Sequence, residues 1–458
     1  MRPRITANLC TVLAVVLGTR AVTTLAQPAP APGDSGGLAA TTPLAPTAGD
    51  QAWNWHAQNT DIIQYHPGFP ALYSGPNSLR DYNEARETVS LDLMAGARLW
   101  PGAEAHVDGL MWQGFGLSRT LGIEGFPNGE AFRVGTRVPN VTLARVFLRQ
   151  TIGLGGEEEA IPDDELHLAA HADVRRVTLT VGRISAKDIF DNNAYANDPR
   201  TQFMNWSLMA NGAWDYAADS LGYITGFAAE LNEPGWAARY GFFQVPRVSN
   251  GLALDPSYLR AWQMVTELER RYQLGGHPGA VRVLGYLTQA HMGSYALALE
   301  EPQRPVDITQ TRAYRHKFGV GLNAEQALSP EVGVFARLGW SDGRTEGWAF
   351  NDVDRTASLG VSVKGKRWNR PEDTFGLAGV LDGISAIHSR FFAAGGTGIL
   401  AGDGRLNYGL EQILETYYDF QIWKSLHGAL DYQFVNNPAF NRDRGPVHVL
   451  GARMHWEF

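Results

Sequence analysis

Apolar and polar residues alternate through most of this chain in segments of about ten residues. In the last dozen residues the apolar side chains occupy every second position: Leu450, Ala452, Met454, Trp456 and Phe458. A period of two predicts a β-strand with one apolar face and one polar face. A single strand of this kind fits the edge of a soluble sheet equally well, so the other segments decide between the two interpretations.

Sixteen such segments follow one another along the chain. They lie near residues 53–64, 88–100, 103–114, 142–153, 174–184, 222–231, 236–244, 262–274, 280–290, 315–327, 331–341, 356–364, 374–383, 412–423, 426–435 and 447–458. Ten residues at about 3.3 Å each, tilted by about 45°, span roughly 23 Å, close to the apolar band of an outer membrane. No run of 18 apolar residues is present, which argues against membrane-spanning helices. The pattern predicts an all-β fold, a transmembrane antiparallel β-barrel of about sixteen strands.

The connections between these segments alternate in length. Short turns follow even-numbered segments at residues 101–102, 232–235, 275–279 and 328–330, whereas long loops follow odd-numbered ones at 65–87, 115–141, 185–221, 291–314 and 384–411. Outer-membrane barrels have short periplasmic turns and long extracellular loops. The acidic segment 154–173 is an exception, because a short turn is expected there. Either it is an elaborated turn, or the strand count is wrong nearby.

The two faces of the predicted strands suit a barrel in lipid. Apolar residues such as Phe318, Val320 and Leu322 share one face, and polar residues such as Asn323 and Glu325 share the other. In outer-membrane lipid the apolar face contacts acyl chains and the polar face lines the lumen. Sixteen strands enclose too wide a lumen for side chains to fill, so we expect a water-filled channel. Closure also leaves no unpaired strand edge in lipid.

The N-terminus is typical of a secretory signal peptide. Arg2 and Arg4 precede an apolar stretch that ends in small residues, which predicts a signal over residues 1–26 with Ala21 as a weaker cleavage site than Ala26. Residues 27–50 are rich in Pro and Ala and predict a flexible leader, so the barrel domain is expected over residues 51–458. The single cysteine, Cys10, lies in the signal, and the mature chain therefore has no disulfide to stabilise it.

Charge excludes some partners. Three of the 39 basic residues lie in the predicted signal, so 36 remain against 47 acidic residues, a net charge of −11. This balance argues against a nucleic-acid partner. Charged residues make up only 19% of the chain, which is low for a soluble protein. The run "DNNAYAND" contains oxygen ligands, but their spacing fits no calcium site, and no metal or other cofactor is predicted.

Several segments closely resemble the carbohydrate-selective porins of the OprB family: "YSGPNSL" (73–79), "QGFGLSRTLGIEGFPNGEAFRVG" (113–135), "RVFLRQTIGLGGE" (145–157), "VGRISAKDIFDNNAYANDPRTQFMNW" (181–206), "GDGRLNYGLEQILETYY" (402–418) and "NRDRGPVHVLGARMHWEF" (441–458). The resemblance implies an outer-membrane barrel that admits sugars by facilitated diffusion. In barrels of this kind a C-terminal aromatic residue is recognised by the barrel-assembly machinery, a role that Phe458 fits. The acidic segment 154–173 departs from the family pattern.

The longest loop, 185–221, carries the first group of candidate pore-lining residues. A sugar in a channel needs hydrogen-bonding groups that replace water and a flat apolar surface for its ring, and it must bind weakly enough to leave. The candidates in this loop are Asp191, Asn193, Arg200 and Trp206. In porins a long early loop commonly folds inward. The alternative is that the Asx residues form turns and that Trp206 anchors the loop on the wall.

Charged residues on the polar faces of the strands form the second group. The candidates are Arg98, Glu104, Arg145, Arg149, Glu415 and Arg453. Guanidinium groups facing carboxylates form a charged eyelet that can donate to sugar hydroxyls. They can equally form salt bridges that stiffen the wall, and both roles are compatible.

Three function classes follow from these features: a carbohydrate porin, a general or ion-preferring porin, and a barrel enzyme such as a lipase or protease. An enzyme needs a nucleophile and a base within hydrogen-bond reach. The twelve histidines are scattered along the chain and give this class little support. We therefore expect a carbohydrate porin without enzymatic activity. A homotrimer of barrels is the candidate assembly.

Overall fold

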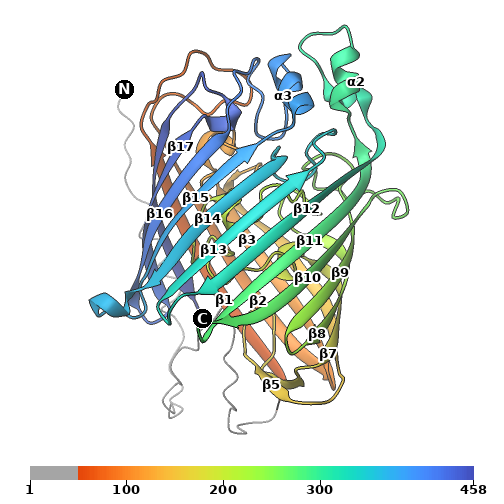
Figure 1. The fold of residues 1–458 in the computed structure, drawn as a ribbon, viewed down its shortest axis with the longest axis vertical. Coiled ribbons are helices and arrows are strands. Elements are labelled where there is room, and N and C mark those ends of the chain that lie inside the picture. Colours follow the sequence, from red (N-terminus) through yellow and green to blue (C-terminus); the bar gives the residue numbers. More distant parts are fainter. Residues whose placement is uncertain (1–49) are drawn as a thin grey trace. The chain divides into compact units, whose positions relative to one another are not determined.

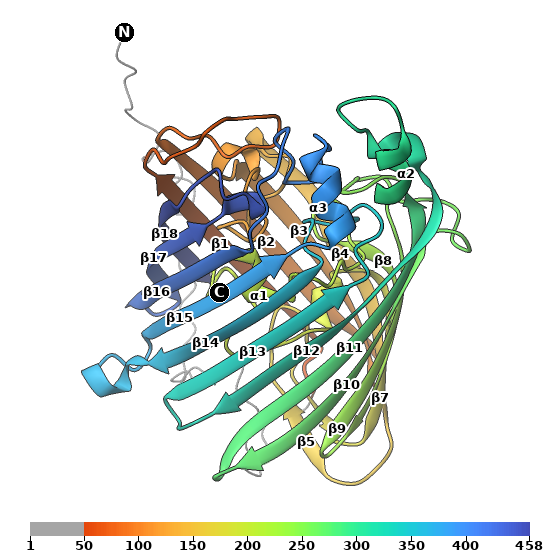
Figure 2. The same cartoon turned by 45° about the horizontal axis from the view of Figure 1, so that its top comes forward.

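The structure, a computed structural model, describes residues 50–458. The predicted signal, residues 1–26, lies outside the described residues, as does all but the last residue of the predicted leader, 27–50. Sixteen antiparallel strands form a closed barrel (Figures 1 and 2). The barrel closes because β1 (Trp53–His66) pairs with β18 (Val447–Glu457) as well as with β2. The predicted fold class is confirmed.

Each barrel strand overlaps one of the sixteen predicted segments, and the differences are confined to strand ends. The other barrel strands are Glu84–Trp100 (β2), Ala103–Gly114 (β3), Thr136–Gly153 (β4), Arg176–Ile184 (β7), Ile224–Glu233 (β8), Trp236–Gln244 (β9), Trp262–Leu274 (β10), His277–Met292 (β11), Ala313–Ala327 (β12), Val332–Ser341 (β13), Arg355–Lys364 (β14), Thr374–Gly383 (β15), Glu411–Trp423 (β16) and Leu426–Asn436 (β17).

The helices are short and lie in the connections. They are α1 (Trp206–Met209), α2 (Tyr295–Glu300), α3 (Ala386–Ala393) and the 3-10 turns Leu117–Arg119, Ala186–Asp188, Ile308–Thr311, Gly365–Trp368 and Pro438–Phe440. Both α2 and α3 stand at the long-loop end of the barrel (Figure 1). Within residues 50–458 no helix is long and apolar enough to cross a membrane.

The acidic segment forms a hairpin of its own. β5 (Glu158–Ile161) pairs with β6 (Ala170–Asp173) in a two-stranded sheet that is separate from the barrel. The backbone N–H of Leu154 donates to the carbonyl of Arg175 at 2.8 Å and closes the base of this hairpin on the β4–β7 ladder. The segment is therefore an elaborated turn at the short-turn end, and the predicted strand count is correct.

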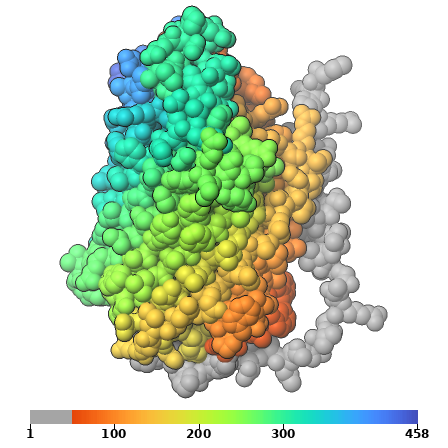
Figure 3. Space-filling model, turned by 90° about the vertical axis from the view of Figure 1, so that its right-hand side faces the viewer, coloured from red at the N-terminus to blue at the C-terminus, as the bar shows by residue number. Residues whose placement is uncertain are grey.

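The wall separates apolar from polar side chains as predicted. On β12, Phe318, Val320 and Leu322 are 46%, 55% and 37% exposed on the outer face. Asn323 and Glu325 of the same strand are buried on the inside. The space-filling view shows the outer surface of β7 to β11 as one continuous wall (Figure 3). In lipid these exposed apolar side chains contact acyl chains.

Exposed aromatic residues mark both borders of the outer apolar face. Trp53, Trp100 and Trp423 lie at the short-turn ends of their strands, and Tyr65 and Trp340 lie near the long-loop ends. Aromatic girdles at both membrane interfaces are typical of transmembrane barrels.

The loop of residues 185–223, which we call the inward loop, folds into the lumen between β7 and β8. Its buried residues Phe190, Trp206, Trp214 and Tyr216 form an apolar cluster with wall residues that include Phe243 of β9. This core lies inside the barrel, where an unobstructed lumen of sixteen strands would hold water. The inward loop therefore narrows the channel.

Candidate functional site

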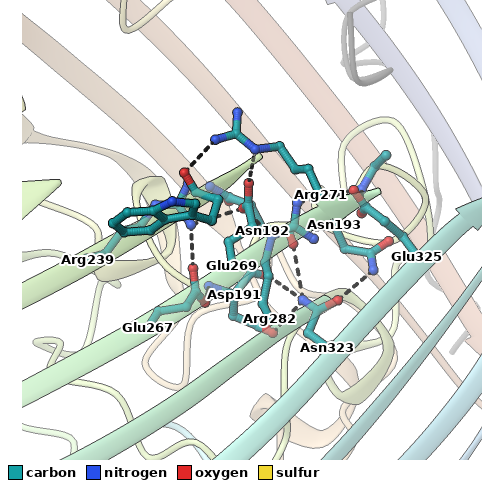
Figure 4. A network of polar contacts seen from close by, with 12 residues as sticks. Asp191, Asn192, Asn193, Arg239, Glu267, Glu269, Arg271, Arg282, Asn323 and Glu325 are labelled. Carbon is teal, nitrogen blue, oxygen red and sulfur yellow. Dashed lines mark hydrogen bonds and ion pairs between the residues drawn. The ribbon is translucent and has the colours of Figure 1, made fainter. Parts of the chain in front are cut away.

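Asp191 is the main anchor of the inward loop on the wall (Figure 4). Its carboxylate accepts from Arg337 of β13 at 3.1 Å, from Asn323 of β12 at 2.7 Å and from Lys187 at 3.3 Å. Its backbone N–H donates to Glu267 of β10 at 2.8 Å. Burial opposes ionisation of Asp191, but Arg337 and Lys187 hold its pKa down at about 2. The loop is thus fixed by a buried, ionised carboxylate.

The wall beside this anchor carries a continuous network of ion pairs across β9 to β12 (Figure 4). Arg239 donates to Glu267 at 2.8 Å and to Glu269 at 3.0 Å. Arg282 then joins Glu269 at 2.8 Å to Glu325 at 3.1 Å. Each carboxylate has a cationic partner, which offsets the cost of burying it.

Glu415 and Arg453 hold the other side of the inward loop. Glu415 accepts the backbone N–H groups of Met204 at 2.6 Å and Asn205 at 3.0 Å. Arg453 donates to the carbonyl of Pro199 at 2.7 Å. Both side chains are buried between loop and wall, so their hydrogen-bonding groups are directed at the loop backbone.

Asn193 is also buried beneath the loop. Its side-chain amide donates to Asn323 at 2.7 Å, and its carbonyl oxygen accepts the N–H groups of Tyr195 and Ala196 at 2.9 and 3.2 Å. These bonds form an Asx turn pinned to the wall, as the alternative interpretation of the loop predicts.

Arg145 lies where the inward loop meets β4. Its guanidinium donates to Asp188 at 2.9 and 2.8 Å and to Asp108 of β3 at 2.7 Å. The ring of Tyr223 lies under it, with 5.1 Å between the guanidinium carbon and the ring centroid. The arginine is therefore held by two carboxylates and one aromatic face.

Arg200 projects from the inward loop to the same region of the wall. It pairs with Asp92 of β2 and with Glu130, each at 3.0 Å. Tyr223 lies within electrostatic range of both arginines. Burial raises the pKa of Tyr223 above its ordinary value; Asp92 adds to this rise, and Arg145 and Arg200 only partly oppose it. We call the group of Asp92, Asp108, Glu130, Arg145, Asp188, Arg200 and Tyr223 the constriction cluster.

A group of packed aromatic side chains supports the inward loop beside the constriction cluster. Trp206 stacks on Phe126 at 4.9 Å and on Tyr216 at 5.9 Å, and it lies 4.7 Å from Phe350, measured between ring centroids. Its side chain is only 6% exposed. Since neighbouring rings cover Trp206, the partly exposed Phe350 has the more accessible ring of the two.

Arg98, Glu104 and Arg149 lie elsewhere, near the short-turn end. Arg149 pairs with Glu104 at 2.8 Å and donates to the carbonyl of Leu166 in the acidic hairpin at 2.5 Å. Arg98 donates to the carbonyl of Gln51 at 2.9 Å. The ten candidates therefore fall into four places: the constriction cluster, the contact between loop and wall, the aromatic group around Trp206, and the hairpin.

Phe458 ends the closing strand on the outer face. Its backbone N–H and carbonyl both pair with Ala57 of β1 at 2.9 Å. Its ring is 60% exposed and lies 5.0 Å from Trp55. Among residues 50–458, no group of three or more His, Cys, Asp or Glu has the geometry to hold a metal ion.

Sequence reasoning did not single out Asp92, Glu130, Tyr223 or Phe350. Asp92 lies on the polar face of "SLDLMAG", so alternation alone could have indicated its direction. Glu130 and Phe350 lie in connections, where no periodic pattern exists, and Tyr223 lies within the predicted segment 222–231, just before β8. Only the folding of the loops brings these three residues together.

Comparison with known proteins agrees with this architecture. Residues 76–458 match the family model described as carbohydrate-selective porin, OprB family. The high-pH structure of Pseudomonas putida OprB is 17% identical with a TM-score of 0.67, over 89% of this chain and 94% of that chain. The outer-membrane channel DcaP of Acinetobacter baumannii is 10% identical with a TM-score of 0.48, over 91% and 99%. A search of curated protein sequences found no match.

The likeness to the Pseudomonas putida OprB structure supports the fold, and the family model covers most of the chain. The closed barrel with its apolar outer face and the family match together identify an outer-membrane carbohydrate channel, and the chain belongs to the carbohydrate-selective porins of the OprB family.

Proposed function

We propose that a sugar crosses the narrowest part of this channel in contact with the constriction cluster. The observation that carries the proposal is the meeting of Arg145 and Arg200 with carboxylates from the wall and the loops. Within residues 50–458, Nη2 of Arg200 makes no hydrogen bond. A sugar hydroxyl can accept from this group.

Phe350 supplies the apolar face in this proposal. Its ring lies 4.7 Å from Trp206 and 5.2 Å from Tyr216, which hold it in place. The C–H groups of a pyranose can rest on such a ring while the hydroxyls reach the charged side. Trp206 then acts as a support for Phe350 and an anchor for the loop.

The cluster presents charged groups of both signs to a solute. Two arginines face four carboxylates at 3.0 Å or less, a formal charge of −2, so donors and acceptors are available to a neutral sugar and an anion is disfavoured. A general or ion-preferring porin is the second candidate, and a strongly ion-selective current without sugar block would favour it.

The test of the proposal is sugar block in planar bilayers. We expect neutral sugars to interrupt the ion current through the native channel and Arg200→Ala to weaken this block. Liposome swelling with a panel of sugars and amino acids then gives the substrate class. Equal permeation of sugars and amino acids of similar size, without any block, would reject a sugar site in the constriction.

We further propose that the chain has no catalytic role. The segment Gly339–Gly343 matches the pattern G-x-S-x-G of hydrolases. Its Ser341 is buried and donates to Asp354 at 3.3 Å, while His388 contacts the other oxygen of Asp354 at 2.9 Å. The hydroxyl of Ser341 therefore bonds to a carboxylate and not to the imidazole of His388, which supports a structural role.

Association of barrels into a homotrimer is a separate proposal. On the outer face of β1, Asn59 and Asp61 lie midway between the aromatic residues Trp55 and Tyr65. Asp61 is partly exposed on this face. A lipid-facing carboxylate at mid-membrane is unfavourable, so contact with another barrel here would remove it from lipid. If Asp61→Leu leaves the native mass in mild detergent unchanged, this contact is rejected.

The barrel-assembly machinery and membrane lipid are the other proposed partners. We propose that the exposed C-terminal ring is read by the barrel-assembly machinery before the strand closes on Ala57, and that the outer apolar band then contacts membrane lipid.

A further inference from the structure

A cavity of about 670 Å³ lies between the inward loop and the acidic hairpin. Strands β2 to β4 and β7 to β9 form its wall, Asp188 and Asn192 of the inward loop border it, and hairpin residues such as Asp164 and His167 close it from the other side. Its volume is within the range of about 300–1,000 Å³ that is usual for small-molecule sites. It is separate from the aromatic part of the constriction, because neither Trp206 nor Phe350 lines it.

The hairpin that bounds this cavity is docked firmly inside the barrel. The carbonyl of Leu166 accepts from Arg149 at 2.5 Å, and the N–H of Leu168 donates to Glu104 at 3.3 Å. Leu168 is buried, and Leu166 packs against the apolar cluster of the inward loop. In the turn between β5 and β6, Asp163 accepts from Asn54 of β1 at 2.7 Å. The docked hairpin therefore forms one wall of the cavity.

The cavity wall offers both donors and acceptors to a ligand. Arg149 donates its side-chain hydrogen bonds from Nη1, and Arg239 donates from Nε and Nη1. Among the described residues, 50–458, no hydrogen bond is made by Nη2 of either arginine. The carboxylates of Glu158 and Glu230 also line the cavity, and they disfavour an anionic ligand.

Apolar and hydroxyl groups complete the lining. Ile189 and Leu168 present hydrocarbon, and the hydroxyl-bearing residues Thr178 and Thr180 of β7 lie between the hairpin and the constriction. Paired guanidinium and carboxylate groups beside hydrocarbon match a neutral polyol better than an ion or an apolar ligand.

We propose that this cavity, which we call the exit chamber, is a second carbohydrate-binding site. It is built by the acidic hairpin and reached from the short-turn, periplasmic end. The inference rests on the proposed sugar passage, and it adds a binding step after the constriction. A neutral sugar leaving the constriction is held in the chamber before release, and a sugar added on the periplasmic side meets the chamber first.

The test uses the full chain in planar bilayers, with maltose added to one side at a time. In one variant an Asn-Gly turn replaces residues 155–174, because the existing bond between Leu154 and Arg175 already closes a short hairpin there. In a second variant, Thr178→Trp, an indole fills the chamber. The matched control is Leu179→Trp, since Leu179 is the next residue on the same strand and is 43% exposed to lipid.

We expect both chamber variants to weaken block by periplasmic maltose, with an affinity about fivefold lower than in the native channel. A change of this size corresponds to the loss of one or two hydrogen bonds. Block by extracellular maltose and the behaviour of Leu179→Trp should stay native, and heat-modifiable migration on gels verifies that each barrel is folded.

The possible results separate the two proposals. Periplasmic block that is native in both variants overturns the exit chamber and leaves the constriction site standing. Equal weakening from both sides overturns a separate chamber, because it shows one shared site. Absence of block in the native channel from either side overturns the proposed sugar passage and the chamber together.

Discussion

Arg145 of β4 donates from Nε and Nη2 to the two carboxylate oxygens of Asp188, at 2.9 and 2.8 Å. This pair joins the barrel wall to the first turn of the inward loop. Asp188 also accepts the N–H of Ser185 at 2.9 Å, so the same carboxylate caps that turn. A two-bond pair fixes both distance and direction, so we expect it to hold this part of the inward loop in place.

Arg145→Lys tests this geometric role. Lysine keeps the positive charge but cannot form two parallel bonds to Asp188, so we expect a noisier open-channel current with ion selectivity nearly unchanged. Arg145→Ala should alter both properties because it also removes a fixed charge. Native current noise in Arg145→Lys would show that the second bond does not hold the loop.

Arg200→Ala tests the charged side of the proposed sugar site. Losing its donors should weaken sugar block by about fivefold to tenfold, and the unpaired Asp92 and Glu130 should shift selectivity toward cations. Sugar titrations and reversal potentials measure the two effects. Arg270→Ala is the control, because Arg270 is exposed on the outer side of β10. Native values for both measurements in Arg200→Ala would exclude this arginine from the site.

Phe350→Ala tests the apolar side. We expect sugar block to weaken by about fivefold, corresponding to about 1 kcal/mol of lost stacking, with small-ion conductance equal or higher. Trp206→Ala removes a buried support and should instead lower thermal stability and change conductance. The roles are reversed if Trp206→Ala weakens block in a stable channel while Phe350→Ala leaves block unchanged.

We expect the inward loop to loosen in acid, because protonation of Asp191 removes the charge that anchors it. The pKa of Asp191, about 2, lies below the ordinary value of 3.8, so its contribution to folding is complete above pH 3.8 and is lost as the pH falls through 2. The difference corresponds to about 2 kcal/mol. Thermal unfolding between pH 5 and 2 measures it. Asp191→Asn should have lower stability at neutral pH and a flatter dependence on pH, and an equally steep dependence would assign the effect to other carboxylates.

Deletion of Phe458 tests the assembly role. We expect less folded barrel in the outer membrane and normal export across the inner membrane, measured by heat-modifiable migration and by fractionation. Phe458→Tyr keeps an aromatic terminus and should assemble normally. If the deletion reduces only thermal stability while the amount assembled is unchanged, the contact with Trp55 matters more than recognition.

The sequence by itself determined the barrel. Alternation is a local property, since each side chain faces lipid or lumen according to its neighbours in the same strand. The sixteen strands, the outward direction of Phe318 and Val320, and the exceptional position of the acidic segment could therefore be predicted. The family could be predicted as well, because its motifs are continuous stretches of sequence.

Only the tertiary structure decided which polar residues remain near the channel. Alternation directs Glu415, Arg453 and Arg145 inward alike, yet the first two are buried under the inward loop and the third borders the constriction. The bond between Met204 and Glu415 joins residues 211 positions apart. Such contacts depend on where the inward loop and the acidic hairpin dock, and docking results from packing and ion pairing between distant segments, which no local pattern records.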